Sequence, residues 1–112
     1  MTLKPPSLGA KLASGRAPAD ALEYELAGEM ASTLGRLGRR LEETLAALRA
    51  FDAQPGADRS GRTALVAEAG LALWHFVVQR EALGLRDSAR VMRDYAVPGE
   101  VRARMGLFPA AG

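Results

Sequence analysis

The sequence predicts an all-α fold, a long antiparallel helical hairpin with two short C-terminal helices, paired with a second copy into a four-helix-bundle-like homodimer. Apolar residues recur at three- and four-residue spacing from Leu22 to Phe51, which places them on one face of a single helix. Residues 62–83 carry an apolar arc too wide for one neighbouring helix to cover. Capping and proline signals divide residues 87–106 into two further, short helices.

Length and composition indicate one small domain. The chain has 112 residues, of which 48% are hydrophobic, as in ordinary folded proteins. It has no cysteine and a single histidine, which excludes disulfides and thiolate metal sites and leaves little for histidine-dependent chemistry. No apolar run approaches the roughly 18 residues of a membrane span, and no secretory signal follows the N-terminal basic residues. We therefore expect no enzymatic activity, cofactor, metal or membrane contact.

The charge is unevenly distributed along the chain, although the net value is only +2. Residues 1–19 contain basic residues and no acid, residues 20–85 are mildly acidic, and residues 86–112 are again basic. This pattern lacks the concentrated basic footprint of a dedicated nucleic-acid-binding protein.

The two ends of the chain are expected to lie outside the folded part. Residues 1–18 contain prolines, glycines and basic residues, and we predict a flexible basic tail there. A targeting or docking arm is the alternative, because the segment has no acid, as in transit peptides. Residues 19–106 form the predicted single helical domain, and residues 107–112 a loose C-terminus.

The first helix is predicted over residues 20–51, with Asp20 as the N-cap and Glu23 at the third position of a capping box. Its apolar ladder consists of Leu22, Leu26, Met30, Leu34, Leu37, Leu41, Leu45, Leu48 and Phe51.

A stripe of small residues runs beside this ladder and includes three glycines. Each glycine lowers helix propensity by roughly 1 kcal/mol relative to alanine, so three in one helix need a reason. Close approach of another helix is one reason, and a kink near Gly35 and Gly38 is the alternative. We predict four of these residues at a dimer or partner interface: Gly28, Ala31, Gly35 and Gly38.

A loop is predicted over residues 52–61, followed by a second helix over residues 62–83 that a Schellman-type stop at Gly84 ends. One apolar face of this helix suits packing against the first helix. Leu71, Trp74 and Val78 extend the apolar surface well to one side. A helix that is apolar over so wide an arc is buried on more than one side, and we therefore add these three residues to the interface candidates.

The C-terminal segment is predicted to form helices over residues 88–95 and 100–105, with Asp87 as an N-cap and Pro98 at a first helical position. One interpretation is a cap that folds back over the hairpin. The alternative is a helix-turn-helix over residues 87–106 whose arginines contact DNA. The nucleic-acid candidates are Arg90, Arg93, Arg102 and Arg104.

Other motifs are weak. Residues 56–63 nearly match a phosphate-binding P-loop, but Arg62 replaces the lysine, Asp58 adds a negative charge, and no strand precedes the loop. His75 has no accompanying cysteine or second histidine, so we expect a solvated or interface residue. Trp74 and Phe76 are typical core residues, with an apolar ligand pocket as the alternative.

Three stretches resemble a small uncharacterised bacterial protein family of about this length: ALEYEL at 21–26, LWHFVVQREALGLRD at 73–87 and DYAVPGEV at 94–101. The resemblance covers about residues 20–106. It implies a cytoplasmic, all-helical bacterial protein without assigned activity, and it therefore adds no functional residue.

The function that the sequence favours is a non-enzymatic structural or interaction module that self-associates as a homodimer. An unknown protein partner is also compatible with the pattern. The alternatives are a small DNA-associated regulator, which the charge pattern disfavours, and a bundle that binds an apolar ligand near Trp74.

Overall fold

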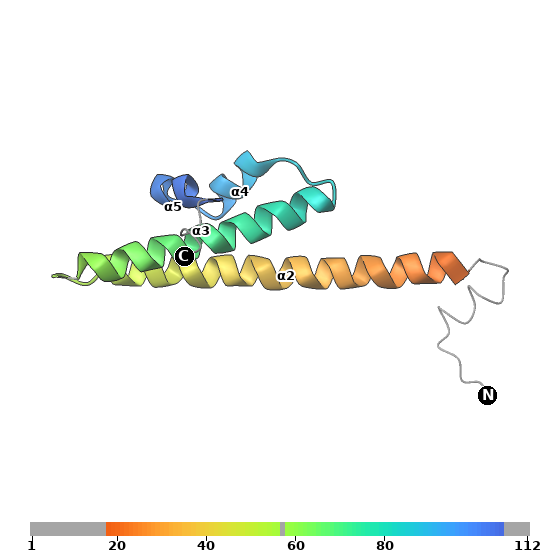
Figure 1. The fold of residues 1–112 in the computed structure, drawn as a ribbon, viewed down its shortest axis with the longest axis horizontal. Coiled ribbons are helices and arrows are strands. Elements are labelled where there is room, and N and C mark those ends of the chain that lie inside the picture. The colour runs from red at the N-terminus through yellow and green to blue at the C-terminus, as the bar shows by residue number, and fades with distance from the viewer. Residues whose placement is uncertain (1–17, 57, 107–112) are drawn as a thin grey trace, which may run out of the picture. The chain divides into compact units, whose positions relative to one another are not determined.

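The computed structural model describes residues 18–56 and 58–106, and within this part every regular element is a helix (Figure 1). The helices are α2 (Pro18–Asp52), α3 (Arg59–Ala82), α4 (Ser88–Asp94) and α5 (Gly99–Arg104). The all-α prediction is thereby confirmed. The predicted tail, apart from Pro18, and the predicted loose C-terminus lie outside the described residues, and the homodimer stays a prediction.

The chain divides by its contacts into two units, Met1–Thr33 and Leu34–Gly112. The described part of the first unit is the N-terminal portion of α2, residues 18–33. Its large apolar side chains are exposed, with relative exposures of 65% for Leu22, 67% for Tyr24 and 52% for Leu26.

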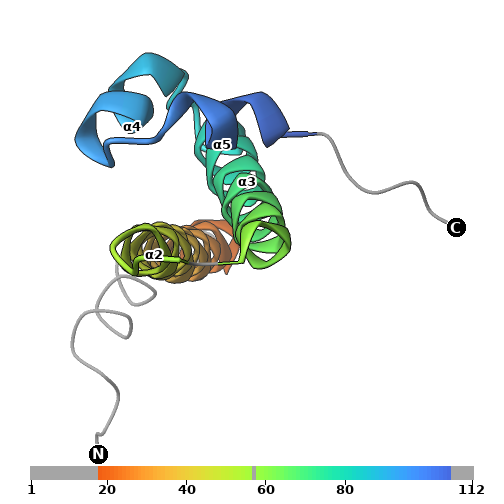
Figure 2. The same cartoon turned by 90° about the vertical axis from the view of Figure 1, so that its left-hand side faces the viewer.

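The second unit holds the core. Residues 34–52 of α2 and the antiparallel helix α3 form a hairpin, and α4 and α5 follow on the other side of α3 (Figures 1 and 2). The predicted hairpin with two short C-terminal helices is confirmed. All four helices contribute buried apolar residues, and the most deeply buried are Leu41, Leu45 and Leu48 of α2, Ala69 and Leu73 of α3, Val91 of α4 and Val101 of α5.

Three helix starts differ from the prediction, and the smallest difference is in α5, which begins at Gly99 with Pro98 as its N-cap and not as a helical residue. Helix α2 begins at Pro18, so Asp20 lies in its first turn and is not the N-cap. Proline suits an early helical position and the carboxylate still faces the positive end of the helix dipole, which explains the shift. Helix α3 begins three residues early, because the Asp58 side chain accepts a hydrogen bond from the Ser60 backbone N–H at 3.2 Å and caps the helix.

Two helices end in the same Schellman arrangement. After α3, the Leu85 N–H donates to Arg80 O and the Gly84 N–H donates to Glu81 O, as the sequence predicts. After α4, Val97 donates to Met92 O and Ala96 donates to Arg93 O. The left-handed position is Gly84 at φ 86° in the first case and Ala96 at φ 51° in the second. The second end therefore holds an alanine in a conformation that glycine adopts more easily.

Two glycines allow helices to approach closely inside the second unit. A Cβ added to Gly38 would lie 3.2 Å from Phe76 Cε1 and from Tyr95 Oη, so this glycine packs against its own chain. A Cβ added to Gly70 would lie 2.7 Å from Arg104 Cβ, which is closer than such atoms can pack. Helix α2 continues through Gly35 and Gly38 as one helix, without a break in its helical hydrogen bonding.

Candidate functional site

Helix α3 keeps an apolar stripe on its exposed side. Leu71, Trp74 and Val78 have relative exposures of 41%, 37% and 42%, while the opposite side of the same helix is buried in the core. The wide apolar arc of this helix is therefore only partly covered by the second unit. Leu85, just beyond the helix end, adds another exposed apolar side chain.

The N-terminal portion of α2 carries exposed small residues as well as exposed leucines. A Cβ added to Gly28 would meet nothing within 4 Å among the described residues. At Gly35, which lies just beyond this portion, an added Cβ would meet only the Arg39 side chain, at 3.5 Å. Ala31 is also exposed. A helical glycine lowers stability relative to alanine, so its presence needs a compensating contact. No such contact occurs at these positions in the described part of the chain.

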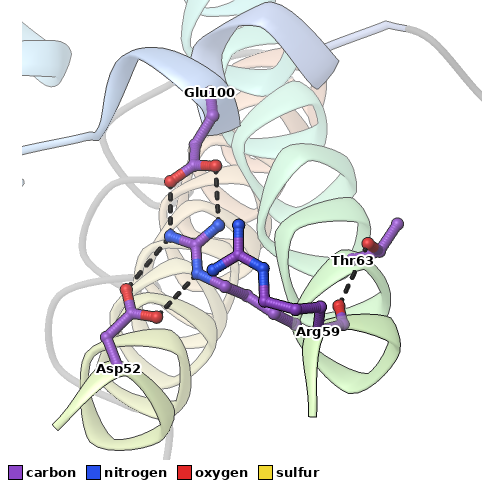
Figure 3. Close-up of polar contacts among 5 residues, drawn as sticks. Asp52, Arg59, Thr63 and Glu100 are labelled. Atoms are coloured by element: carbon purple, nitrogen blue, oxygen red, sulfur yellow. Dashed lines mark hydrogen bonds and ion pairs between the residues drawn. The ribbon is translucent and has the colours of Figure 1, made fainter. Parts of the chain in front are cut away.

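Arg62 connects three helices through two carboxylates. Its Nε donates to Asp52 Oδ1 at 2.6 Å, and its Nη2 donates to Asp52 Oδ2 at 3.1 Å, at the end of α2. Its Nη1 and Nη2 donate to the two carboxylate oxygens of Glu100 in α5, at 2.7 and 2.5 Å. Figure 3 shows both carboxylates facing this guanidinium, which is 17% exposed. Paired N–H···O bonds of this kind fix geometry as well as charge.

The arginine–carboxylate cluster shifts the ionisation of its members. Hydrogen bonds from Arg62 lower the pKa of Asp52 and the pKa of Glu100. The bonds to Glu100 and then to Asp52 raise the pKa of Arg62 further above its already high value. The positive charge of Arg59 also favours the ionised form of both carboxylates. Asp52, Glu100 and Arg62 are therefore charged at neutral pH.

A hollow of about 430 Å³ lies beside this cluster, where α3 and α5 meet. The two helices pack directly on each other, with Arg104 against Gly70. Three arginines, one carboxylate, one hydroxyl and two apolar side chains line the hollow: Arg59, Arg62, Arg104, Glu100, Thr63, Val66 and Ala103.

A family model, described as a family of unknown function, matches residues 7–112. The chain belongs to the DUF6665 family. This agrees with the resemblance to an uncharacterised family, whereas bacterial origin and cytoplasmic location stay predictions. The comparisons found no match among curated proteins or solved structures. Membership in DUF6665 assigns no activity, so the function has to be inferred from the geometry.

The nucleic-acid candidates of this DUF6665 chain do not form one surface of free arginines. Arg90 pairs with Asp94 at 3.4 Å within α4, and Arg104 lines the hollow. Arg93 and Arg102 are exposed. Helices α4 and α5 have only seven and six residues, and α5 packs on α3, so neither resembles the longer recognition helix of DNA-binding motifs.

Residues 56 and 58–63 of the P-loop-like segment are described, whereas Ala57 is not. The side chains of two of these residues have structural roles. Asp58 caps α3, and Arg62 is occupied by two carboxylates. No group of three metal-ligating side chains occurs among the described residues. In the same part of the chain, no helix has the length and apolar character needed to cross a membrane.

Sequence reasoning missed the arginine cluster. The available signal was an acid at the end of one helix, Asp52, and an arginine one turn into the next, Arg62, since the two ends of a tight hairpin lie close together. Nothing in the local sequence indicated that Glu100, 38 residues further along, would complete the cluster.

Proposed function

We propose that this chain is a non-enzymatic helical interaction module that self-associates as a homodimer. The observation that carries the proposal is the stripe of Leu71, Trp74 and Val78, which α3 leaves exposed although its other side is fully buried. Full burial of an exposed apolar side chain contributes about 1.5–3 kcal/mol. Because 37–42% of each of these side chains is still exposed, covering all three contributes a corresponding part of that free energy to association.

Regular spacing distinguishes this stripe from scattered surface apolar residues, which are common and need no explanation. The three residues follow one another at three- and four-residue intervals, which suits packing against a second helix. A two-fold interface would place the same stripe on both copies, and this is the commonest arrangement in soluble oligomers.

The N-terminal portion of α2 supports the proposal independently. Leu22 and Leu26 are more than half exposed, and Gly28 and Ala31 leave space for a close neighbour. A helix from another chain packed on this face would bury the exposed leucines and could approach closely at the small residues. The α3 stripe and the exposed N-terminal portion of α2 can therefore be tested by separate substitutions.

The experiment is a mass measurement by light scattering across protein concentrations from about ten to several hundred micromolar, a range in which moderate protein–protein affinities show. We expect the mass of a dimer, and its loss in the double variant Leu71→Arg with Val78→Arg. Ala47→Arg with Ala50→Arg is the matched control, because it adds the same two charges at exposed positions of α2 outside both interface candidates. A second double variant, Leu22→Arg with Leu26→Arg, tests the N-terminal portion of α2.

Circular dichroism must show that each variant keeps its helix content. A wild-type chain that is monomeric at every concentration would refute the self-association. A dimer that survives the α3 substitutions would remove the α3 stripe from the interface, and one that survives both double variants would remove both.

A further inference from the structure

The hollow between α3 and α5 carries one more positive than negative charge when the whole cluster is counted. Arg59, Arg62 and Arg104 are opposed by Asp52 and Glu100. Both carboxylates are bound to Arg62 by paired hydrogen bonds and also lie in the field of Arg59. Arg59 and Arg104 are therefore the two arginines of the hollow that neither carboxylate of this cluster holds by a hydrogen bond.

Arg104 is held at the hollow by its backbone. A Cβ on Gly70 would lie 2.7 Å from Arg104 Cβ and 3.2 Å from its carbonyl carbon, so only glycine lets α5 settle here. The Arg104 Nε is buried and has no hydrogen-bond partner among the described residues. An unsatisfied buried donor costs about 1–3 kcal/mol, and native proteins rarely leave one without a reason.

We propose that this hollow binds a small tetrahedral oxyanion, the phosphate group of a small molecule, with Arg104 and Arg59 as its hydrogen-bond donors. The guanidinium fork matches phosphate geometry, and neither Arg104 nor Arg59 is hydrogen-bonded to the carboxylates of the cluster, so both side chains line the hollow with donors for such a ligand. Arg62 contributes mainly fixed positive charge, because four of its five N–H donors are bound to the two carboxylates.

The size and lining of the hollow fit this class of ligand. Its volume of about 430 Å³ exceeds that of a bare phosphate and admits a small organic group beside it. Val66 and Ala103 provide apolar wall for such a group, and the Thr63 hydroxyl adds a polar contact. The site is independent of the self-association proposed above, since the stripe of Leu71, Trp74 and Val78 takes no part in it.

The experiment is a calorimetric titration of the full chain at constant ionic strength, with sodium chloride as the balancing salt. The probes are inorganic phosphate and glycerol 3-phosphate. We expect saturable one-to-one binding. Tighter binding of the ester would show that the hollow also contacts the organic group, whereas equal affinity would restrict recognition to the phosphate.

Arg104→Gln should weaken binding about tenfold or more, which is the typical loss of a hydrogen bond to a charged group. Arg102→Gln is the matched control, because it removes the same charge from an exposed position of the same helix and should leave the affinity within about twofold. Absence of saturable binding in the wild-type chain overturns the proposal. Equal weakening in both variants also overturns it, since that result reports only net charge.

A third variant keeps the test decisive if Arg104→Gln does not fold. Arg104→Lys retains the charge and the aliphatic stem but lacks the planar fork, so it should still weaken phosphate binding several-fold. Phosphate bound as tightly by this variant as by the wild-type chain would show that Arg104 does not donate to the ligand, and the proposal would fail.

Discussion

The two ends of the α2 ladder carry the same residue type at the same spacing, yet their burial is opposite. Leu41, Leu45 and Leu48 have relative exposures of 0–2%, whereas Leu22 and Leu26 have 65% and 52%. Helical periodicity therefore specifies which face is apolar, and the presence of a partner decides whether that face is buried.

Helix length explains why one chain cannot bury its whole ladder. Helix α2 has 35 residues and α3 has 24, which correspond to about 52 and 36 Å at 1.5 Å per residue. A helix can cover only as much of its neighbour as its own length. The same contrast appears in the glycines, because Gly38 packs against Phe76 and Tyr95 whereas Gly28 meets open space in the described structure.

The largest expected effect comes from truncating a leucine in each part of the ladder. Leu45→Ala should lower the free energy of unfolding by about 2–5 kcal/mol, because it removes buried contacts and leaves a cavity. Leu26→Ala should change it by about 0.5 kcal/mol or less when the chain is monomeric, because the side chain is already exposed. Urea denaturation followed by circular dichroism measures both values.

Protein concentration is the control for this pair. If residues 18–33 lie at a dimer interface, the cost of Leu26→Ala should grow as the concentration rises, since association stabilises the folded state by mass action. A loss as large as that of Leu45→Ala at the lowest concentration would contradict the distinction between the two parts.

Replacing a glycine by alanine should change the free energy of unfolding in opposite directions in the two units. Gly70→Ala should destabilise the chain by about 1–3 kcal/mol, because the new Cβ would meet Arg104 at 2.7 Å. Gly28→Ala should stabilise the helix by up to about 1 kcal/mol, because the added methyl group meets open space. The same denaturation assay applies. Destabilisation by Gly28→Ala that appears only at high concentration would instead indicate a closely packed neighbour from another chain.

Two helix ends within the second unit offer a smaller effect of about 1 kcal/mol. Ala96→Gly should raise stability because Ala96 holds a left-handed backbone conformation at φ 51°, which costs an alanine about 1–2 kcal/mol. The entropy that glycine loses on folding offsets part of this gain. Gly84→Ala, at the equivalent position after α3, is the matched reverse change and should lower the melting temperature. If both substitutions shift stability in the same direction, the shared Schellman geometry does not control these ends.

Much of the fold could be predicted from the sequence because its signals are local. The helix around Leu41, the stop at Gly84 and the N-cap at Asp87 each depend on residues within a few positions. The exposure of Leu71, Trp74 and Val78 agrees with the expectation that one chain cannot cover α3, although an interface there stays a prediction.

The hollow and its arginines could not be predicted, because they depend on distant contacts. In the sequence, Arg62 is recognisable only as the residue that replaces the lysine of a P-loop. The packing of α5 on α3 brings Glu100 to it and reveals its structural role. The close approach of Gly70 to Arg104 likewise depends on a tertiary contact between residues 34 positions apart. The local spacing of apolar residues predicts a helix and its buried face, but it does not identify the element that packs against that face.

The smallest expected effect is an acid sensitivity confined to the second unit. The pKa values of Asp52 and Glu100 are lowered in the folded chain by their hydrogen bonds to Arg62, so the unfolded chain binds protons more readily. Their contribution to stability is fully present above the unfolded pKa values of about 4 and is lost as the pH falls through the lowered folded values. The effect is modest because the two side chains are 45% and 47% exposed, where solvent screens the pairs. Urea midpoints measured at pH 6 and pH 3 should therefore fall more in the wild-type chain than in Arg62→Gln, which lacks the shared partner. If the two chains lose the same amount, the acid sensitivity comes from other carboxylates and Arg62 does not tie α5 to the hairpin.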